Sequence, residues 1–307
     1  MDIIILLFGF SIGLVLLVKG ADEMVSSAIQ IALKFKLPSS IVGATFIGFG
    51  TSAPELFAST RAALKGDLDL GIGNIVGSNI ANSLLVVAVL YLALPKDYSK
   101  KINLNKISPT WMAILTTIFV STYVLTNKFP FLLGLALLVL VLYVIYKMIS
   151  SESDDEEELI EEEKSYIWLR GGMSLVATLY GSQLVVENAV EIASIFGVSS
   201  LVIGSTIIAI GTSLPEVAGT ISAAKMRKPD IVFGNIFGSN LFNIGLVGGA
   251  AIMISPGEIS SVIDYQLFIM YFVSFIVIFL SRNIIKRNAI LGYVFIAVYV
   301  LFLISLF

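Results

Sequence analysis

A polar signature occurs twice in this chain, with a constant spacing between the copies. Residues 50–55 read Gly-Thr-Ser-Ala-Pro-Glu, and residues 211–216 read Gly-Thr-Ser-Leu-Pro-Glu. A second block, Gly-Asn-x-x-Gly-Ser-Asn, begins at Gly73 and again at Gly234, so both pairs are offset by 161 residues. One ancestral unit was therefore duplicated whole, and the fold must contain two related halves.

Apolar sequence surrounds both copies. Hydrophobic residues make up 57% of the 307 residues and charged residues only 13%, which lies outside the soluble globular range. Barrel strands would be shorter and would alternate in polarity. The sequence therefore predicts an all-α membrane protein with ten transmembrane helices. Each lies in an apolar run long enough to cross a hydrocarbon core of about 30 Å: roughly 2–19, 40–64, 70–94, 108–126, 129–149, 166–194, 200–224, 230–254, 262–281 and 288–306.

The first run lacks a convincing cleavage site, so we interpret it as a retained helix rather than a signal peptide. Its pattern leaves room for a long, tilted helix that continues past Gly20 to about Ile31.

An acidic linker, 150–165, divides the runs into five plus five. Nine of its residues are Asp or Glu, and we expect a solvated cytoplasmic segment that keeps like charges apart. A regulatory Ca²⁺ site is less favoured, because the spaced ligands and glycine turn of a calcium loop are missing. An odd number of crossings per half makes the second half enter from the opposite side. The predicted domains are thus two inverted five-helix repeats, 1–149 and 166–307, with motif regions 41–84 and 202–245, which share 18 identities in 44 aligned positions.

Basic residues orient the chain. With the N-terminus outside, fifteen Lys and Arg residues fall in cytoplasmic loops, whereas the outside holds only Arg61, Lys65 and Lys128; Lys19 lies near the end of the first run. Cytoplasmic loops carry an excess of positive charge. We therefore expect a multi-pass protein of the cell (inner) membrane with both termini outside.

Two carboxylates lie in the apolar runs that carry the motifs. Glu55 and Glu216 sit near the middle of the second and seventh runs, where an ionisable group costs about 2.5–3.5 kcal/mol and usually faces a cavity or a partner. A protonated Glu bonded to a neighbouring helix is the alternative, but the duplicated context disfavours it. Thr51 and Ser52 place oxygens on the same helical face as Glu55, at i, i+4 and i, i+3.

Each motif also contains a proline that predicts a broken helix. The ring of Pro54 clashes with the carbonyl of Gly50, four residues earlier. We expect the second helix to open there and to free carbonyls over 47–50 as ligands, and Pro215 to do the same over 208–211. Irregular backbone at this depth must be buried in protein or line a cavity.

The second block adds a polar stripe on the following helix of each half. Asn74, Ser78 and Asn82 recur every four residues, and the second copy supplies Asn235, Ser239 and Asn243. Ser78, Asn82, Ser239 and Asn243 are interpreted as ligands. For the first Asn of each stripe, a ligand role and a structural hydrogen bond remain equally open. The glycines of the block leave room for close helix contact.

These groups form a set of hard oxygen donors. The chain has no Cys and no His, which removes thiol and imidazole chemistry and the usual zinc ligands. Carboxylates, hydroxyls, amide oxygens and carbonyls suit Na⁺ and Ca²⁺. We expect no enzymatic activity, because the hydroxyls beside Glu55 lack a His or Lys base within the motifs. No cofactor is expected, and nucleic acid is not an expected partner.

The two blocks resemble the alpha repeats of the sodium/calcium exchangers, in the calcium/cation antiporter superfamily, and the chain is similar to a prokaryotic member. The resemblance implies a secondary antiporter that exchanges Na⁺ for Ca²⁺ by alternating access and extrudes Ca²⁺, with three Na⁺ moved per Ca²⁺. It implies Glu55 and Glu216 as shared calcium ligands. It further implies sodium sites lined by the hydroxyls of Thr51, Ser52, Ser78, Thr212, Ser213 and Ser239. The carbonyls of Gly48 and Ala209 would contribute to the site, and the amides of Asn82 and Asn243 would close its middle.

One position departs from part of that family. Several relatives, including the potassium-dependent exchangers, carry Asp where this chain has Asn243, which puts K⁺ co-transport in doubt. Proton/calcium exchangers usually carry Glu where this chain has Ser78 and Ser239, but an H⁺/Ca²⁺ or other cation/Ca²⁺ antiporter remains the alternative. A cation channel is the rival from another class. Both half-sites lie in one polypeptide, so a monomer in the lipid bilayer is expected to function.

Alternating access predicts a moving part. We expect the first and sixth helices to slide against a fixed bundle that holds the motifs. Gly20 and Gly181, also 161 residues apart, are the expected flex or contact points.

Overall fold

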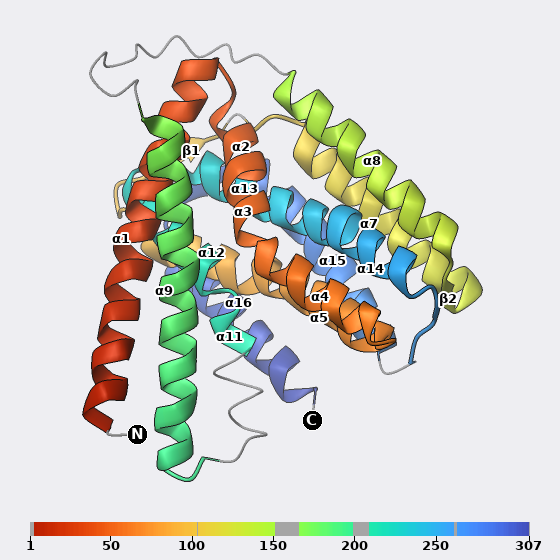
Figure 1. The fold of residues 1–307 in the computed structure, drawn as a ribbon. Helices are drawn as coiled ribbons and strands as arrows, with labels where there is room; N and C mark the ends of the chain where they lie inside the picture. Colours follow the sequence, from red (N-terminus) through yellow and green to blue (C-terminus); the bar gives the residue numbers. More distant parts are fainter. Residues whose placement is uncertain (1–2, 103, 151–165, 199–208, 261–262, 307) are drawn as a thin grey trace.

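The computed structural model describes residues 3–102, 104–150, 166–198, 209–260 and 263–306, and these residues are almost entirely helical (Figure 1). The first half contains α1 (Ile3–Phe35), α2 (Ser39–Val42), η1 (Gly43–Ile47), α3 (Gly48–Thr51), α4 (Ala53–Leu64), α5 (Leu68–Ala81), η2 (Asn82–Val86), α6 (Val87–Ala93), α7 (Ile107–Thr126) and α8 (Phe131–Ile149). The second half contains α9 (Ile167–Ile195), α11 (Ala209–Gly211), α12 (Leu214–Lys225), α13 (Pro229–Phe242), η5 (Asn243–Gly248), α14 (Gly249–Ile254), α15 (Asp264–Ser281) and α16 (Ala289–Ile304).

Within the described ranges, six helices are long and apolar enough to cross a membrane. The bent pair 39–51 and 53–64, which turns by 46°, is a seventh candidate, and α16 is a shorter apolar helix. Helix α9 is 29 residues long but falls outside that set. The chain is therefore a multi-pass membrane protein, and the count of ten spans remains a prediction. The acidic linker, apart from Ser150, and residues 199–208 of the seventh expected span lie outside the described residues.

Two long helices form one flank of the molecule. Helices α1 and α9 lie side by side along most of their length (Figure 1). As predicted, α1 continues well past Gly20, to Phe35. Gly20 faces Thr178, and a Cβ on Gly181 would lie 2.4 Å from the Leu17 nitrogen. The two glycines are therefore contact points that allow the helix backbones to approach closely.

The centre of the fold is a crossing between the two halves. Helix α13 packs against the broken segment α2–η1–α3, and small residues set the separation. A Cβ on Gly238 would lie 2.3 Å from the Ala44 carbonyl oxygen, and one on Gly234 would lie 2.2 Å from that of Ser40. The corresponding neighbours of α5 in the other half would fall in 199–208, outside the described residues.

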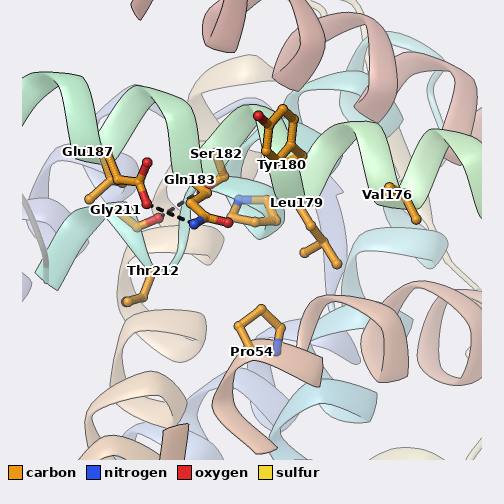
Figure 2. A pocket seen from close by; sticks show the side chains of 11 residues that line it. Pro54, Val176, Leu179, Tyr180, Ser182, Gln183, Glu187, Gly211 and Thr212 are labelled. Atoms are coloured by element: carbon orange, nitrogen blue, oxygen red, sulfur yellow. Dashed lines mark hydrogen bonds between the residues drawn. The ribbon is translucent and has the colours of Figure 1, made fainter. Parts of the chain in front are cut away.

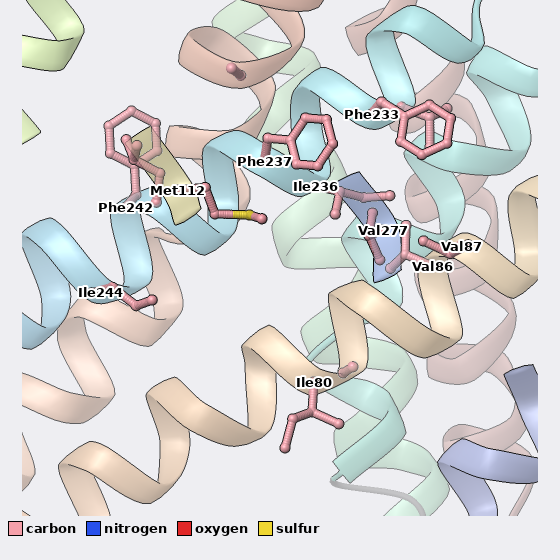
Figure 3. Packing of buried hydrophobic residues seen from close by; sticks show 14 of the residues in the cluster. Ile80, Val86, Val87, Met112, Phe233, Ile236, Phe237, Phe242, Ile244 and Val277 are labelled. Atoms are coloured by element: carbon pink, nitrogen blue, oxygen red, sulfur yellow. The ribbon is translucent and has the colours of Figure 1, made fainter. Parts of the chain in front are cut away.

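Apolar side chains fill the space around this crossing. Phe233, Ile236 and Phe237 of α13 belong to the same buried apolar cluster as Ile80 of α5 and Val86 of η2 (Figure 3), and all five are essentially inaccessible to solvent. Large apolar side chains exposed on the outer helix faces, such as those of α8 and α16, fit a lipid environment. Most of the polar motif residues are thus buried in the interior of the fold.

Among the described residues, two short ribbons join loops of the two halves. Strand β1 (Ser99–Lys101) pairs antiparallel with β4 (Ile284–Lys286), and β2 (Lys128–Phe129) pairs antiparallel with β3 (Gly257–Glu258). An ion pair between Lys128 and Glu258, at 3.0 Å, accompanies the second ribbon. These strands were not predicted from the sequence, because strands of two or three residues leave little pattern in it.

In the part of the chain that the structure describes, three segments are π-helical, which was also not predicted. They are η1, η2 and η5, and the last two begin at Asn82 and Asn243, which are 161 residues apart. A π-helical turn widens the helix and often marks a functional site. The π-helical turns η2 and η5 follow the second block of each half, so the wider turn lies beside the candidate ligands.

Candidate ion-binding site

Glu55 and Glu216 each occupy the first turn of a helix that starts at a motif. Helix α4 begins at Ala53 and α12 at Leu214, and each has a proline at its start. A helix N-terminus stabilises negative charge through its free N–H groups. Glu55 is 3% exposed and Glu216 2%, and the two carboxylates are close enough for their charges to interact. The structure therefore brings the two acids together inside the protein.

The break before each acid is present, but its effect on the backbone differs from the prediction. Helix α3 ends at Thr51 and turns through Ser52 into α4. The Gly48 carbonyl still accepts the Ser52 N–H, at 3.2 Å, so it is not freed. It also lies 3.3 Å from the Ser239 hydroxyl and 3.5 Å from the Thr51 hydroxyl. The bend thus gathers hydroxyls around this carbonyl instead of leaving it bare.

Hydroxyls from both halves meet between the acids. The Thr51 and Ser239 oxygens lie 3.4 Å apart, and the Thr51 hydroxyl lies close to Glu216. On the other side, the Ser78 hydroxyl donates to Oε1 of Glu55 at 3.2 Å. Asn243 donates to the Ser78 oxygen, also at 3.2 Å. Each acid is therefore in contact with a side chain from the opposite half or from the second block of its own half.

Five candidate ligand oxygens in this cluster are buried without a hydrogen-bond partner among the described residues: Glu55 Oε2, Glu216 Oε2, Asn82 Oδ1, Asn243 Oδ1 and Ser52 Oγ. Four of them are two pairs related by the 161-residue repeat. A buried polar atom without a partner costs about 1–3 kcal/mol, more when it is charged. A dehydrated cation coordinated by these oxygens would remove that cost.

The remaining predicted residues are placed as follows. Ser213 is buried, whereas Thr212 is exposed and lines a cavity, unlike its buried counterpart Thr51. Ala209 begins α11, and only its backbone is described. The two halves thus differ at the seventh expected span.

The first Asn of each stripe has a hydrogen-bonding partner within its own half. Asn74 donates to the Ser59 hydroxyl at 2.9 Å. The Ser239 hydroxyl lies 3.3 Å from both Asn235 Oδ1 and the Gly48 carbonyl, and its one proton can go to either acceptor. Asn74 therefore has a structural contact one helical turn beyond Glu55, whereas Asn235 touches a candidate ligand.

A cavity of about 540 Å³ lies between α9 and the motif helices (Figure 2). Pro54 and Pro215, each next to an acid, line it together with Thr212. On α9, Gln183 donates to Glu187 at 2.8 Å, and Ser182 donates to the Gly211 carbonyl at 3.2 Å. The cavity extends from the broken backbone to a face of α9.

Comparisons with known proteins agree with this arrangement. The family model described as sodium/calcium exchanger protein matches residues 5–151 and 166–307. The putative antiporter CaxA of Alkalimonas amylolytica is 38% identical over 81% of both chains. The sodium/calcium exchanger MaX1 of Methanosarcina acetivorans is 31% identical over 96% of this chain and 97% of its own. The solved exchanger NCX_Mj, soaked with Na⁺ and Sr²⁺, superposes over 100% of both chains with a TM-score of 0.83 at 27% identity.

The fold and the oxygen-lined interior define a membrane transporter of cations. The chain belongs to the sodium/calcium exchanger family. It is a cation/Ca²⁺ antiporter, as the resemblance of its motifs implied.

Proposed function

We propose that this chain exchanges Na⁺ for Ca²⁺ at one shared site between Glu55 and Glu216, and that it extrudes Ca²⁺ from the cell. The observation that carries the proposal is the set of unpartnered, buried oxygens around the two acids. Two carboxylates neutralise one Ca²⁺, and Ca²⁺ takes six to eight oxygen ligands. Hydroxyls and carbonyls beside the acids supply weaker, dispersed positions for Na⁺: Thr51, Ser52, Ser78, Thr212, Ser213, Ser239, Gly48 and Ala209, with Asn82 and Asn243 between them.

The electrical driving force favours extrusion. Exchange of three Na⁺ for one Ca²⁺ moves one net charge, worth about 2.3 kcal/mol per 100 mV. With Na⁺ entering a cell that is negative inside, Ca²⁺ leaves. Among the described residues, no cluster of three or more Asp, Glu, His or Cys could hold a metal ion, so the site depends on two acids and neutral oxygens. This composition favours K⁺-independent exchange.

The proposed domains are two inverted five-helix repeats, 1–149 and 166–307, joined by the linker 150–165. Contacts between distant loops support this topology, because ten crossings would place the partners of each contact on one side. The cytoplasmic set comprises β1 with β4, Arg227 with Asp97, and Asn105 with Ser40. The outer set comprises β2 with β3, and Asp69 with Ser260. Both chain ends also lie toward the same end of the molecule (Figure 1).

Cysteine labelling tests this topology without background, because the chain has no Cys. Lys65 and Lys100 are both exposed, and the topology places them outside and inside, respectively. We expect a membrane-impermeant maleimide to label Lys65→Cys in intact cells, and Lys100→Cys only after permeabilisation. The reverse pattern would contradict the orientation. Equal labelling of both in intact cells would contradict the number of crossings.

Alternating access is proposed to move α1 and α9 together against the bundle. A cross-link that fixes α9 to the motif backbone should then stop transport. A Cβ on Gly211 would lie 3.4 Å from that of Val186 on α9, close to the 3.5–4.5 Å of a disulfide. Oxidised Gly211→Cys/Val186→Cys protein should lose uptake and regain it on reduction.

The matched control joins α1 to α9. The Cβ atoms at Gly171 on α9 and Ser27 on α1 would lie 3.4 Å apart, so Gly171→Cys/Ser27→Cys protein should cross-link within the moving unit and retain uptake. Loss of uptake in the α1–α9 cross-link with retention in the other would overturn the proposed motion.

The experiment that tests the function is ⁴⁵Ca²⁺ uptake into proteoliposomes, with internal Na⁺, K⁺ and pH varied separately. We expect uptake to require internal Na⁺ and to be unchanged by K⁺. Uptake driven by a proton gradient without Na⁺ would favour the H⁺/Ca²⁺ alternative. Uptake independent of any opposing cation would favour a channel. Reconstitution at less than one chain per vesicle tests whether the monomer is sufficient for transport. The cell membrane is the expected location of the protein.

A further inference from the structure

Asn79 and Asn240 are the last residues of the two copies of the second block, and neither is among the candidate ligands. Both side chains are fully buried. Each accepts a hydrogen bond from an amide of the opposite half: Asn243 donates to Asn79 Oδ1 at 3.0 Å, and Asn82 donates to Asn240 Oδ1 at 3.1 Å. The two candidate ligands are therefore held across the interface between the repeats.

The direction of each hydrogen bond on the Asn79 side is fixed by a main-chain group. A backbone carbonyl can only accept, and Asn79 Nδ2 donates to the carbonyl of Asn240 at 3.4 Å. Its Oδ1 must therefore face Asn243, whose Nδ2 donates both to it and to Ser78 Oγ. The Ser78 proton then goes to Glu55 Oε1. One carbonyl thus orients four side chains in succession.

These hydrogen bonds leave one oxygen of each oriented ligand side chain without a partner. Both N–H groups of Asn243 donate hydrogen bonds, so its Oδ1 points to the opposite side. Oε1 of Glu55 accepts from Ser78, which leaves Oε2 as the second carboxylate oxygen. Asn243 Oδ1 and Glu55 Oε2 both lack a partner among the described residues. On the other side, Asn240 donates to the Ser83 hydroxyl at 3.2 Å and accepts from Asn82, which leaves Asn82 Oδ1 without a partner. An amide turned the other way would present an N–H donor to a cation.

We propose that Asn79 and Asn240 are positioning residues that lock the amides of Asn243 and Asn82 with their oxygens toward the transported cation. This inference rests on the proposed function of that site. Groups that orient metal ligands without touching the metal typically change affinity by about 10- to 100-fold when they are removed. The same hydrogen bonds also couple the two repeats, because ligand orientation in one half depends on a side chain of the other.

The test is a double-mutant cycle on Na⁺-driven ⁴⁵Ca²⁺ uptake by the reconstituted full chain. Asn79→Ala should raise the KM for Ca²⁺ by at least about tenfold, with a much smaller change in maximal rate. In an Asn243→Asp background both terminal atoms are oxygens, so orientation no longer matters. There, adding Asn79→Ala should change KM by less than about threefold, because the two substitutions remove the same interaction and their effects are therefore not additive.

A purely structural role predicts a different pattern. It would give the same KM increase in both backgrounds, and that result would overturn the proposal, as would an unchanged KM in Asn79→Ala alone. Asn74→Ala, in the same helix but bonded to Ser59, is the matched control and should leave KM unchanged. If Asn79→Ala does not fold, the corresponding cycle of Asn240→Ala with Asn82→Asp decides. Absence of Na⁺-driven uptake in the wild type would contradict the proposed function, whereas wild-type uptake with an insensitive Asn79→Ala would overturn only this inference.

Discussion

Replacing Glu55 by Gln should abolish Na⁺-driven Ca²⁺ uptake, and Glu216→Gln should do the same. Either change leaves one carboxylate to balance a doubly charged ion and places an N–H donor among the coordinating oxygens. Breaking a buried charge pair costs about 3–5 kcal/mol, which corresponds to a loss of uptake of more than about 100-fold. Initial rates of ⁴⁵Ca²⁺ uptake into proteoliposomes with internal Na⁺ give the measurement.

Glu191→Gln provides the matched control. Glu191 lies near the end of α9 and is exposed, so its substitution removes the same charge without touching the cluster. Its uptake should stay close to that of the wild type. Full sodium-dependent uptake by either Glu55→Gln or Glu216→Gln would contradict the assignment of that acid.

Gly238→Ala should destabilise the folded protein although the added group is a single methyl. The new Cβ would lie 2.3 Å from the Ala44 carbonyl oxygen and 2.4 Å from its Cα, so the helix backbones must separate. Overpacking of this kind costs about 1–3 kcal/mol or more. Because Ser239 and Gly48 meet at the same crossing, uptake should fall together with the thermal unfolding temperature in detergent.

The same substitution at Gly172 separates steric from conformational effects. Gly172 lies on α9, and a Cβ there would meet no described atom within 4 Å. Helix propensity alone favours Ala over Gly by about 1 kcal/mol, so Gly172→Ala should be neutral or stabilising. Equal unfolding temperatures for the two variants would show that the close approach at Gly238 does not constrain the fold.

Much of the site could be predicted because its residues are unusual in an apolar chain. The acids, the prolines and the polar stripe stand out against their surroundings, and the repeat at a constant offset shows that they form pairs. The structure places Glu55 and Glu216 together in the interior, and their roles as ion ligands stay predictions. The long α1 and the break beside Pro54 also followed from local sequence chemistry.

Other features depend on contacts that no local pattern contains. The Gly48 carbonyl was expected to be free, but it keeps its helical hydrogen bond and also lies within hydrogen-bonding distance of the Ser239 hydroxyl, which comes from the other half. The orientation of Asn243 depends on Asn79, 164 residues away. A four-residue periodicity drew attention to Asn74, Ser78 and Asn82 and passed over Asn79. The repetition of Asn79 as Asn240 was the available signal, because an apolar interior seldom keeps an amide twice without a hydrogen-bonding reason.

Equilibrium ⁴⁵Ca²⁺ binding to the purified protein, titrated with Na⁺, tests most directly whether both ions use one site. The proposed site predicts one bound Ca²⁺ per chain, displaced steeply by more than one Na⁺, and no binding in the Glu55→Gln/Glu216→Gln double variant. Calcium binding that Na⁺ does not displace, or that persists without the two acids, would contradict it.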